Sequence, residues 1–139
     1  MTFTNEPDVI RRLLVERGRW AVVGLSANRA RAAYAVSAYL QQTLGHEIVP
    51  VHPSAAAVHG AAGYRTLADV PGRIDVVDVF VNSALAGAVV DAAVAVGARA
   101  VWLQLGVVDL AAVERAAAAG LDVVMDACPV IEGSRLGLD

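Results

Sequence analysis

The chain has 139 residues, which fits one domain; 57% of them are hydrophobic and only 18% are charged. This balance argues against a disordered chain, and charged, Gly or Asn residues interrupt every apolar stretch before it reaches membrane-spanning length. The net charge of −3 argues against a general nucleic-acid binder, and the absence of lysine excludes Schiff-base and lysine-dependent P-loop chemistry.

The first predicted element is a helix over residues 8–17, directly after Pro7. The N-terminal stretch MTFTNEPDVIRRLL carries acids early and lacks a basic region followed by an apolar one, unlike a signal peptide. Cys128 is the only cysteine, so no internal disulfide can form. We therefore expect a cytoplasmic protein.

Apolar segments of strand length then alternate with helical segments along the chain. The expected strands are 20–25, 47–51, 74–80, 100–105 and 121–125. The expected helices are 30–45, 83–97 and 109–120. Continuous Val-rich runs indicate strands that are covered on both faces. The alternation predicts one domain over 1–139: a doubly wound, Rossmann-like, mostly parallel five-stranded sheet with helices on both faces and a short N-terminal helix before it.

Two segments read as less regular. Residues 53–72 predict a short helix, a turn and a surface segment around Tyr64. The tail from Cys128 predicts a loop with at most one helical turn. His46 directly follows the helix-ending Gly45, which favours an exposed side chain.

The turn after the first strand carries the main functional signal. In RWAVVGLSANRARAAYAV, residues 19–36, the strand ends in Gly24-Leu25-Ser26. Ligands of open parallel sheets bind at this edge, and Gly24 lets the backbone approach a ligand closely. Ser26 and a helix start near Ala30 supply hydrogen-bond donors, while Arg29 and Arg31 match phosphate oxygens. The turn predicts a site for a ligand with several phosphates.

The end of the second strand bears on which phosphorylated ligand it is. A nicotinamide site needs Gly-x-Gly-x-x-Gly and an acid about 20 residues further on. Only the first glycine is present, and the second strand ends in Pro50-Val51-His52-Pro53 without an acid. This argues against NAD and offers instead a stiff, mostly apolar ledge for a base.

Catalytic and metal chemistry find little support in the residues. Ser26 has no evident histidine partner and no Gly-x-Ser-x-Gly elbow, and the three histidines lack the spacing of a metal site. Gln104 is a polar residue in an apolar run, and it either binds backbone or lines the crevice. We predict no catalytic residues and no metal ligands.

Six motifs, in order and spacing, resemble one family. They are WAVVGLS with Arg31 downstream, VPVHP, GYRTLADVP, IDVVDVFV, VWLQLG and AGLDVVMDACPVIE. The chain is similar over about residues 15–133 to the small single-domain CoA-binding proteins. These are Rossmann-like and resemble the CoA-binding domain of the succinyl-CoA ligase alpha subunit.

The resemblance implies coenzyme A or an acyl-CoA as ligand and assigns residues to it by position. Gly24, Leu25 and Ser26 would line the pyrophosphate, with Arg31 and its helper Arg29 at phosphates. The other implied contacts are Val51, His52 and Pro53 at the adenine and ribose, and Val81, Asn82 and Ser83 along the ligand.

The chain departs from that family's pattern at three places. His52 stands where asparagine is common, and Ala33 where serine is common. Val81, Asn82 and Ala84 replace an arginine-arginine-x-glutamate pattern, which removes charged contacts to phosphates or a partner.

Three functions stay open on the sequence. The first is a non-enzymatic module that binds CoA or acyl-CoA through its ADP moiety. The second is the CoA-binding component of an acyl-CoA ligase or transferase, acting with a separate partner chain of ATP-grasp type. The third is an NAD(H)-sensing Rossmann domain, against which the missing ribose acid and glycines argue.

Overall fold

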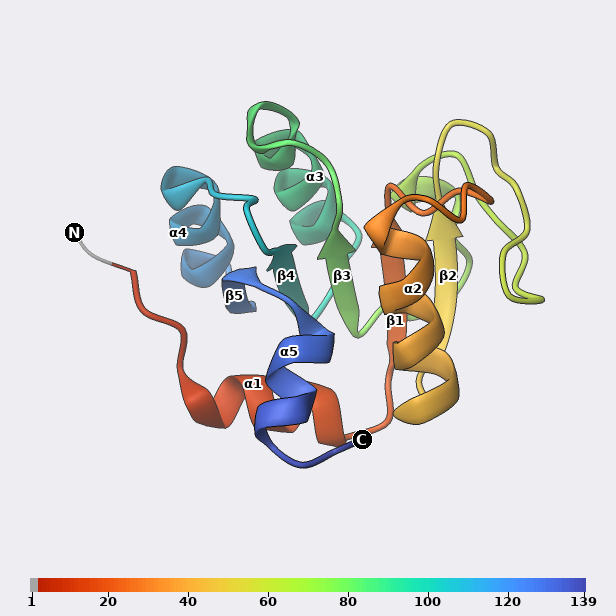
Figure 1. Cartoon of the computed structure of the whole chain (residues 1–139). Coiled ribbons are helices and arrows are strands. Elements are labelled where there is room, and N and C mark those ends of the chain that lie inside the picture. The colour runs from red at the N-terminus through yellow and green to blue at the C-terminus, as the bar shows by residue number, and fades with distance from the viewer. Residues whose placement is uncertain (1–2) are drawn as a thin grey trace.

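Five parallel strands form one sheet in the order β2-β1-β3-β4-β5 in the computed structural model, which describes residues 3–139 (Figure 1). The strands are β1 Arg19–Val23, β2 Glu47–Val51, β3 Val76–Val79, β4 Ala100–Gln104 and β5 Asp122–Ala127. Every neighbouring pair is parallel. The predicted doubly wound fold is confirmed, with a sheet that is parallel throughout.

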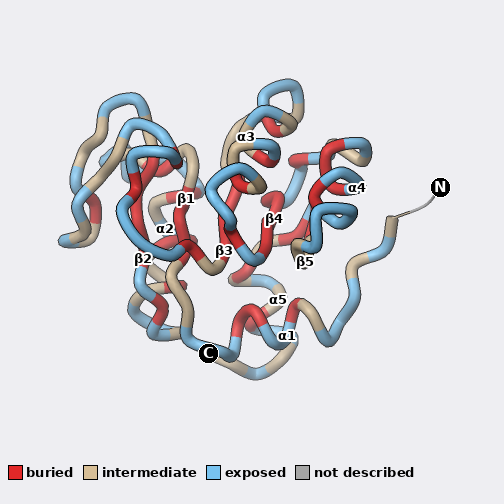
Figure 2. The backbone as a smooth tube through the Cα atoms, turned by 180° about the vertical axis from the view of Figure 1, so that it is seen from behind, coloured by how far each residue is buried: buried red, intermediate tan, exposed pale blue. Residues whose placement is uncertain are grey.

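Helices cover both faces of this sheet (Figures 1 and 2). They are α1 Pro7–Val15, α2 Ala32–Ala38 with a π-helical turn Tyr39–Thr43, α3 Ser83–Ala95, α4 Leu110–Ala118 and α5 Pro129–Arg135. α3 and α4 pack on one face and α1, α2 and α5 on the other. None of the helices in residues 3–139 is long and apolar enough to cross a membrane.

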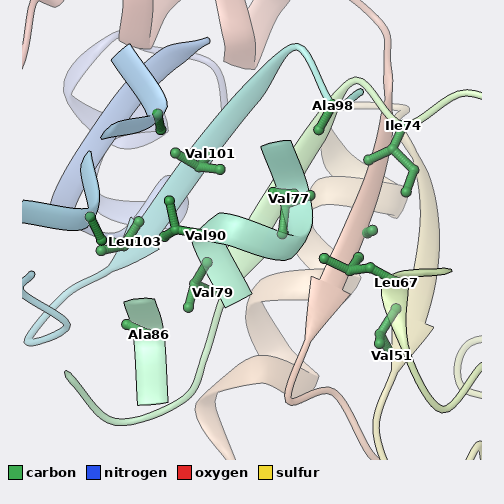
Figure 3. Close-up of a cluster of buried hydrophobic side chains, with 14 of the residues drawn as sticks. Val51, Leu67, Ile74, Val77, Val79, Ala86, Val90, Ala98, Val101 and Leu103 are labelled. Atoms are coloured by element: carbon green, nitrogen blue, oxygen red, sulfur yellow. The ribbon is translucent and has the colours of Figure 1, made fainter. Parts of the chain in front are cut away.

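Two apolar clusters hold the layers together, because alternate strand residues point to opposite faces. On the α3 side, Val77, Val79, Val101 and Leu103 pack against Val90 and its neighbours (Figure 3). On the other side, Trp20 and Trp102 are fully buried with ring centroids 5.7 Å apart. The Val-rich strands are buried on both faces, as expected for parallel strands.

The strand order fixes where a ligand can bind. The chain leaves β1 to reach β2 on one side, and after β2 it crosses to β3 on the other side of β1. The winding therefore reverses between β1 and β3, and the loops after these two strands separate. Such a switch point at the carboxyl ends of the strands forms the ligand crevice of doubly wound sheets.

The tail after Cys128 is a helix, α5, and not the predicted loop. Pro129 stands at its first position, where proline favours a helix start. Gly133 has no side chain, and a Cβ there would collide with the Tyr39 hydroxyl of the π-helical turn. The helix forms because it packs against α1 and this turn, and those contacts are not visible in the local pattern.

Residues 53–72 hold less helix than predicted, with only a 3₁₀ turn at Leu67–Asp69. The segment around Tyr64 runs beside the end of β2. Tyr64 donates its backbone N–H to the Pro50 carbonyl and accepts from the His52 N–H, both at 3.0 Å. This pairing satisfies backbone groups on the outer edge of β2, which has no other strand beside it.

His46 is buried, so the predicted exposure is wrong. Its Nδ1 accepts from the Gly18 N–H at 3.1 Å, and its Nε2 lies 3.0 Å from the Leu14 carbonyl oxygen. The ring also packs against Trp20, with centroids 5.3 Å apart. Two backbone partners make a buried histidine stable here, and the helix-cap position alone did not reveal them.

Candidate functional site

A cleft of 440 Å³ opens at the carboxyl ends of β1, β2 and β3, directly at the switch point. Its lining comes mainly from the loops that lead into α2 and α3 and from the loop that follows β2. The lining residues are Val23, Gly24, Ser26, Arg31, Ala32, Ala33, Val51, His52, Pro53, Arg65, Phe80, Val81, Asn82 and Leu85.

Gly24 gives the floor of the cleft its shape. Its φ is +101°, a conformation that side-chain-bearing residues rarely adopt. Its N–H donates to the Val51 carbonyl at 2.8 Å, and a Cβ on it would lie 2.7 Å from the Phe80 carbonyl oxygen. The glycine thus lets the ends of β1, β2 and β3 meet closely below a ligand.

The charge of the cleft is positive. Arg31 precedes α2, and Arg65 lies in the loop after β2. Neither guanidinium forms an ion pair with a carboxylate in residues 3–139, and no Asp or Glu is among the lining residues. In a chain of net charge −3, this concentrates two free cations at the switch point. Guanidinium groups bind phosphate oxygens through paired N–H donors.

His52 adds a directed donor at the end of β2. Its Nδ1 lies 3.1 Å from the Ser54 N–H and 2.9 Å from the Ser54 hydroxyl. A backbone N–H can only donate, so Nδ1 is the acceptor and the neutral ring carries its proton on Nε2. Nε2–H then remains available to a ligand in the cleft.

The predicted site residues fall into two groups. Gly24, Ser26, Arg31, Val51, His52, Pro53, Val81 and Asn82 line the cleft, whereas Leu25, Arg29 and Ser83 do not. The Leu25 side chain is fully buried in the α2-side core. Arg29 is exposed, 5.8 Å above the Tyr34 ring, because α2 begins at Ala32 and not near Ala30. The Ser83 hydroxyl binds the β4–α4 loop.

Six lining residues were missed by sequence reasoning: Val23, Ala32, Ala33, Arg65, Phe80 and Leu85. Arg65 stands in the irregular segment, where no periodicity shows which way a side chain points. It reaches the cleft because Tyr64 pairs with the end of β2. Leu85 lies in the first turn of α3, and its position follows only from knowing where that helix starts.

A larger hollow of 640 Å³ lies at the opposite, amino-terminal edge of the strands. Three of its four arginines pair with carboxylates: Arg12 with Asp122 at 2.9 Å, and Arg73 and Arg99 with Asp75 at 3.2 Å and 3.9 Å. These pairs largely balance its charge, and ligands of parallel sheets bind at the other edge. We therefore take the smaller cleft as the candidate functional site. Within residues 3–139, no group of His, Cys, Asp and Glu is arranged to hold a metal ion.

This chain belongs to the CoA binding domain family, which matches residues 18–134. Among curated proteins, the uncharacterized protein YneT of Bacillus subtilis (strain 168) is 34% identical over 119 residues. That alignment covers 86% of this chain and 87% of YneT. The family resemblance seen in the motifs is confirmed.

Solved structures share the fold. Prb, described as the PH1109 protein redesigned for binding, superimposes with a TM-score of 0.90 at 34% identity, covering 98% of this chain and 95% of that chain. The fold also occurs within a longer chain, the acetyl-coenzyme A synthetase 1 of Ca. Korarchaeum cryptofilum. That match has a TM-score of 0.70 and 22% identity, and it covers 84% of this chain and 28% of the synthetase.

Proposed function

We propose that this chain binds coenzyme A or an acyl-CoA through the phosphorylated ADP moiety, as a binding module without catalytic groups of its own. The observation that carries this proposal is the cleft at the β1/β3 switch point, which, among residues 3–139, is lined by two arginines without an ion pair and by no carboxylate. Membership of the CoA binding domain family supports the same ligand.

The lining residues suggest how the ligand lies. The pyrophosphate approaches the backbone at Gly24 and the Ser26 hydroxyl, which already accepts from the Asn28 N–H at 3.2 Å and keeps its own O–H to donate. Arg31 and Arg65 face the phosphates. Val51 and Pro53 offer an apolar ledge to the adenine, with the His52 Nε2–H at its side.

NAD is a poorer fit for the same cleft. A dinucleotide site holds the ribose diol with an acid at the end of the second strand, and here His52 and Pro53 occupy that place. Carboxylates are absent from the cleft lining as the structure describes it. A ligand with more phosphate charge and no need of a ribose acid is favoured.

A ligase role with a separate chain is the second candidate. The observation in its favour is that the same fold is one part of the longer acetyl-coenzyme A synthetase chain. In this reading an ATP-grasp-type partner supplies the nucleotide-activating chemistry. Affinity purification of the tagged chain should recover such a partner if this role is right. If no such partner is recovered, the binding module is the function that remains.

Calorimetric titration of the purified, nucleotide-stripped chain tests the proposal. We expect CoA to bind with micromolar or tighter Kd, ADP more weakly because it lacks one phosphate and the pantetheine arm, and NAD not measurably. NAD binding as tight as CoA binding would overturn the proposal in favour of a dinucleotide site. Absence of binding by CoA would overturn it outright.

A further inference from the structure

Large apolar side chains stand unusually exposed beside the cleft. Leu85 lines the cleft with 57% of its surface exposed. Leu105 and Val108, in the loop between β4 and α4, are 56% and 48% exposed. Burying such side chains is favourable, and Leu85 lines the cleft while Leu105 and Val108 stand in the loop next to it, so an apolar part of a ligand that extends beyond the cleft could be covered there. We call Leu85, Leu105 and Val108 the apolar shelf.

The two parts of the shelf are fixed to each other. The Ser83 hydroxyl accepts from the Val108 N–H at 2.9 Å and donates to the Gly106 carbonyl at 3.4 Å. This joins the first residue of α3 to the β4–α4 loop at the same edge of the sheet (Figure 1). Leu85, two residues after Ser83 in the first turn of α3, therefore stands on the helix end that is bonded to the loop carrying Leu105 and Val108.

Gln104 lies directly before the shelf. It is the last residue of β4, only 7% exposed, and its Oε1 has no hydrogen-bond partner. A buried amide oxygen without a donor is costly, which is why such groups are rare in proteins. Gln104 is not among the residues that line the cleft, and this oxygen is closed off from the surface, so it is no contact for a ligand there.

The charge beside the shelf is negative. Asp126 is exposed at the end of β5, and its Oδ1 accepts from the Gly106 N–H at 2.7 Å. Gly106 directly follows Leu105, so this carboxylate stands at the border of the shelf. The two free arginines lie at the other end of the cleft, towards α2 and β2. Asp126 would repel a ligand that places a carboxylate of its own at the shelf.

From this arrangement, and resting on the proposed function, we infer that the chain selects acyl-CoA thioesters with an apolar acyl group. The pantetheine arm leaves the cleft beside Leu85 and crosses the ends of β3 and β4. The acyl chain then lies on the apolar shelf. Asp126 disfavours acyl groups that end in a carboxylate, such as a succinyl group.

The test compares CoA, hexanoyl-CoA and succinyl-CoA by calorimetry on the full chain. A buried methylene strengthens binding by about fourfold, so a six-carbon chain that is partly covered should bind roughly tenfold tighter than CoA. Succinyl-CoA should bind no tighter than CoA. Equal binding of hexanoyl-CoA and CoA would overturn the inference while leaving the proposed function intact. If CoA itself does not bind, the proposed function fails first.

Matched variants locate the effect. Leu105→Ser should remove most of the preference for hexanoyl-CoA while CoA binds as before. Val15→Ser is the control, because Val15 is similarly exposed, at 48%, but lies at the end of α1 outside the cleft. Asp126→Asn keeps an oxygen for the Gly106 N–H, and asparagine tolerates the positive φ of +58° at this position. It should tighten succinyl-CoA binding severalfold, and unchanged binding would show that Asp126 does not set the selectivity.

Discussion

Gly24 and Phe80 approach each other so closely that a Cβ on Gly24 would lie 2.7 Å from the Phe80 carbonyl oxygen. The contact joins the ends of β1 and β3, the two strands between which the winding of the sheet reverses. The same glycine holds β2 through its N–H bond to the Val51 carbonyl. The crevice that lies over these three strands therefore depends on one residue without a side chain.

Gly24→Ala should destabilise the chain and distort the cleft. The left-handed backbone and the close carbonyl together should lower the free energy of unfolding by about 3 kcal/mol, measured by urea denaturation. Gly97→Ala is the control, since Gly97 also has a positive φ, +76°, but open space around it. It should lose only about 1 kcal/mol. Equal losses in the two variants would show that the Phe80 contact matters little.

The two cleft arginines should each matter for ligand affinity. Arg31→Ala and Arg65→Ala should each weaken CoA binding by about 1–3 kcal/mol, the range of a charge-assisted hydrogen bond. Their affinities should also depend less on salt than that of the unmodified chain, because one phosphate contact is lost. Calorimetry in low and moderate salt measures both effects.

Arg29→Ala is the control for those variants. Arg29 was predicted as a helper at the phosphates, but it lies outside the cleft over the Tyr34 ring. Its removal should change CoA affinity by less than either of the other two. A larger loss for Arg29→Ala than for Arg31→Ala would mean that the phosphates bind over the 26–31 loop and not in the cleft.

The features that could be predicted best from the sequence are those that the local pattern of residues determines. Val-rich runs such as residues 76–79 are buried on both faces, so the strands followed from these runs and the fold class from their alternation with helical segments. The turn at Gly24 and Ser26 was located because ligand sites in this kind of sheet sit at strand ends. The orientation of Leu25 was not predicted, because a one-residue difference in register moves a side chain from the crevice to the core.

Features that depend on distant contacts could not be predicted. Arg65 enters the cleft because Tyr64 pairs with β2, and α5 forms because Gly133 makes room for Tyr39. His46 is buried because Gly18 and Leu14 supply backbone partners from 28 and 32 residues away. None of these long-range contacts produces a periodic pattern of apolar residues in the sequence.

His46 should make the fold sensitive to mild acid. Burial lowers the pKa of its imidazole, so the folded chain resists protonation that the unfolded chain accepts. The free energy of unfolding should therefore fall as the pH drops below about 6.5, the pKa of histidine in the unfolded chain. The loss should stop once the pH lies below the pKa of His46 in the folded chain. His46→Gln cannot titrate there, so its urea midpoint should change less between pH 7 and pH 5. Parallel changes in both chains would rule out His46 as the source.

Asp78 should have the opposite dependence on pH. Its carboxyl is fully buried in β3 between Val22 of β1 and Trp102 of β4, and neither oxygen has a hydrogen-bond partner. Burial raises its pKa well above the ordinary value, so the folded chain keeps the proton that the unfolded chain releases above about pH 4. Stability should fall as the pH rises from there towards the folded pKa, and level off beyond it.

Asp78→Asn tests this, because the amide has nearly the same shape and cannot ionise. The variant should gain free energy of unfolding relative to the unmodified chain as the pH rises from 4 to 8, followed by urea denaturation at each pH. Glu114→Gln, at an exposed position of α4, removes one carboxylate without burial and should show no such gain. A gain of the same size in both variants would trace the effect to overall charge. A gain confined to Asp78→Asn would establish that the buried carboxyl of Asp78 holds its proton in the folded chain.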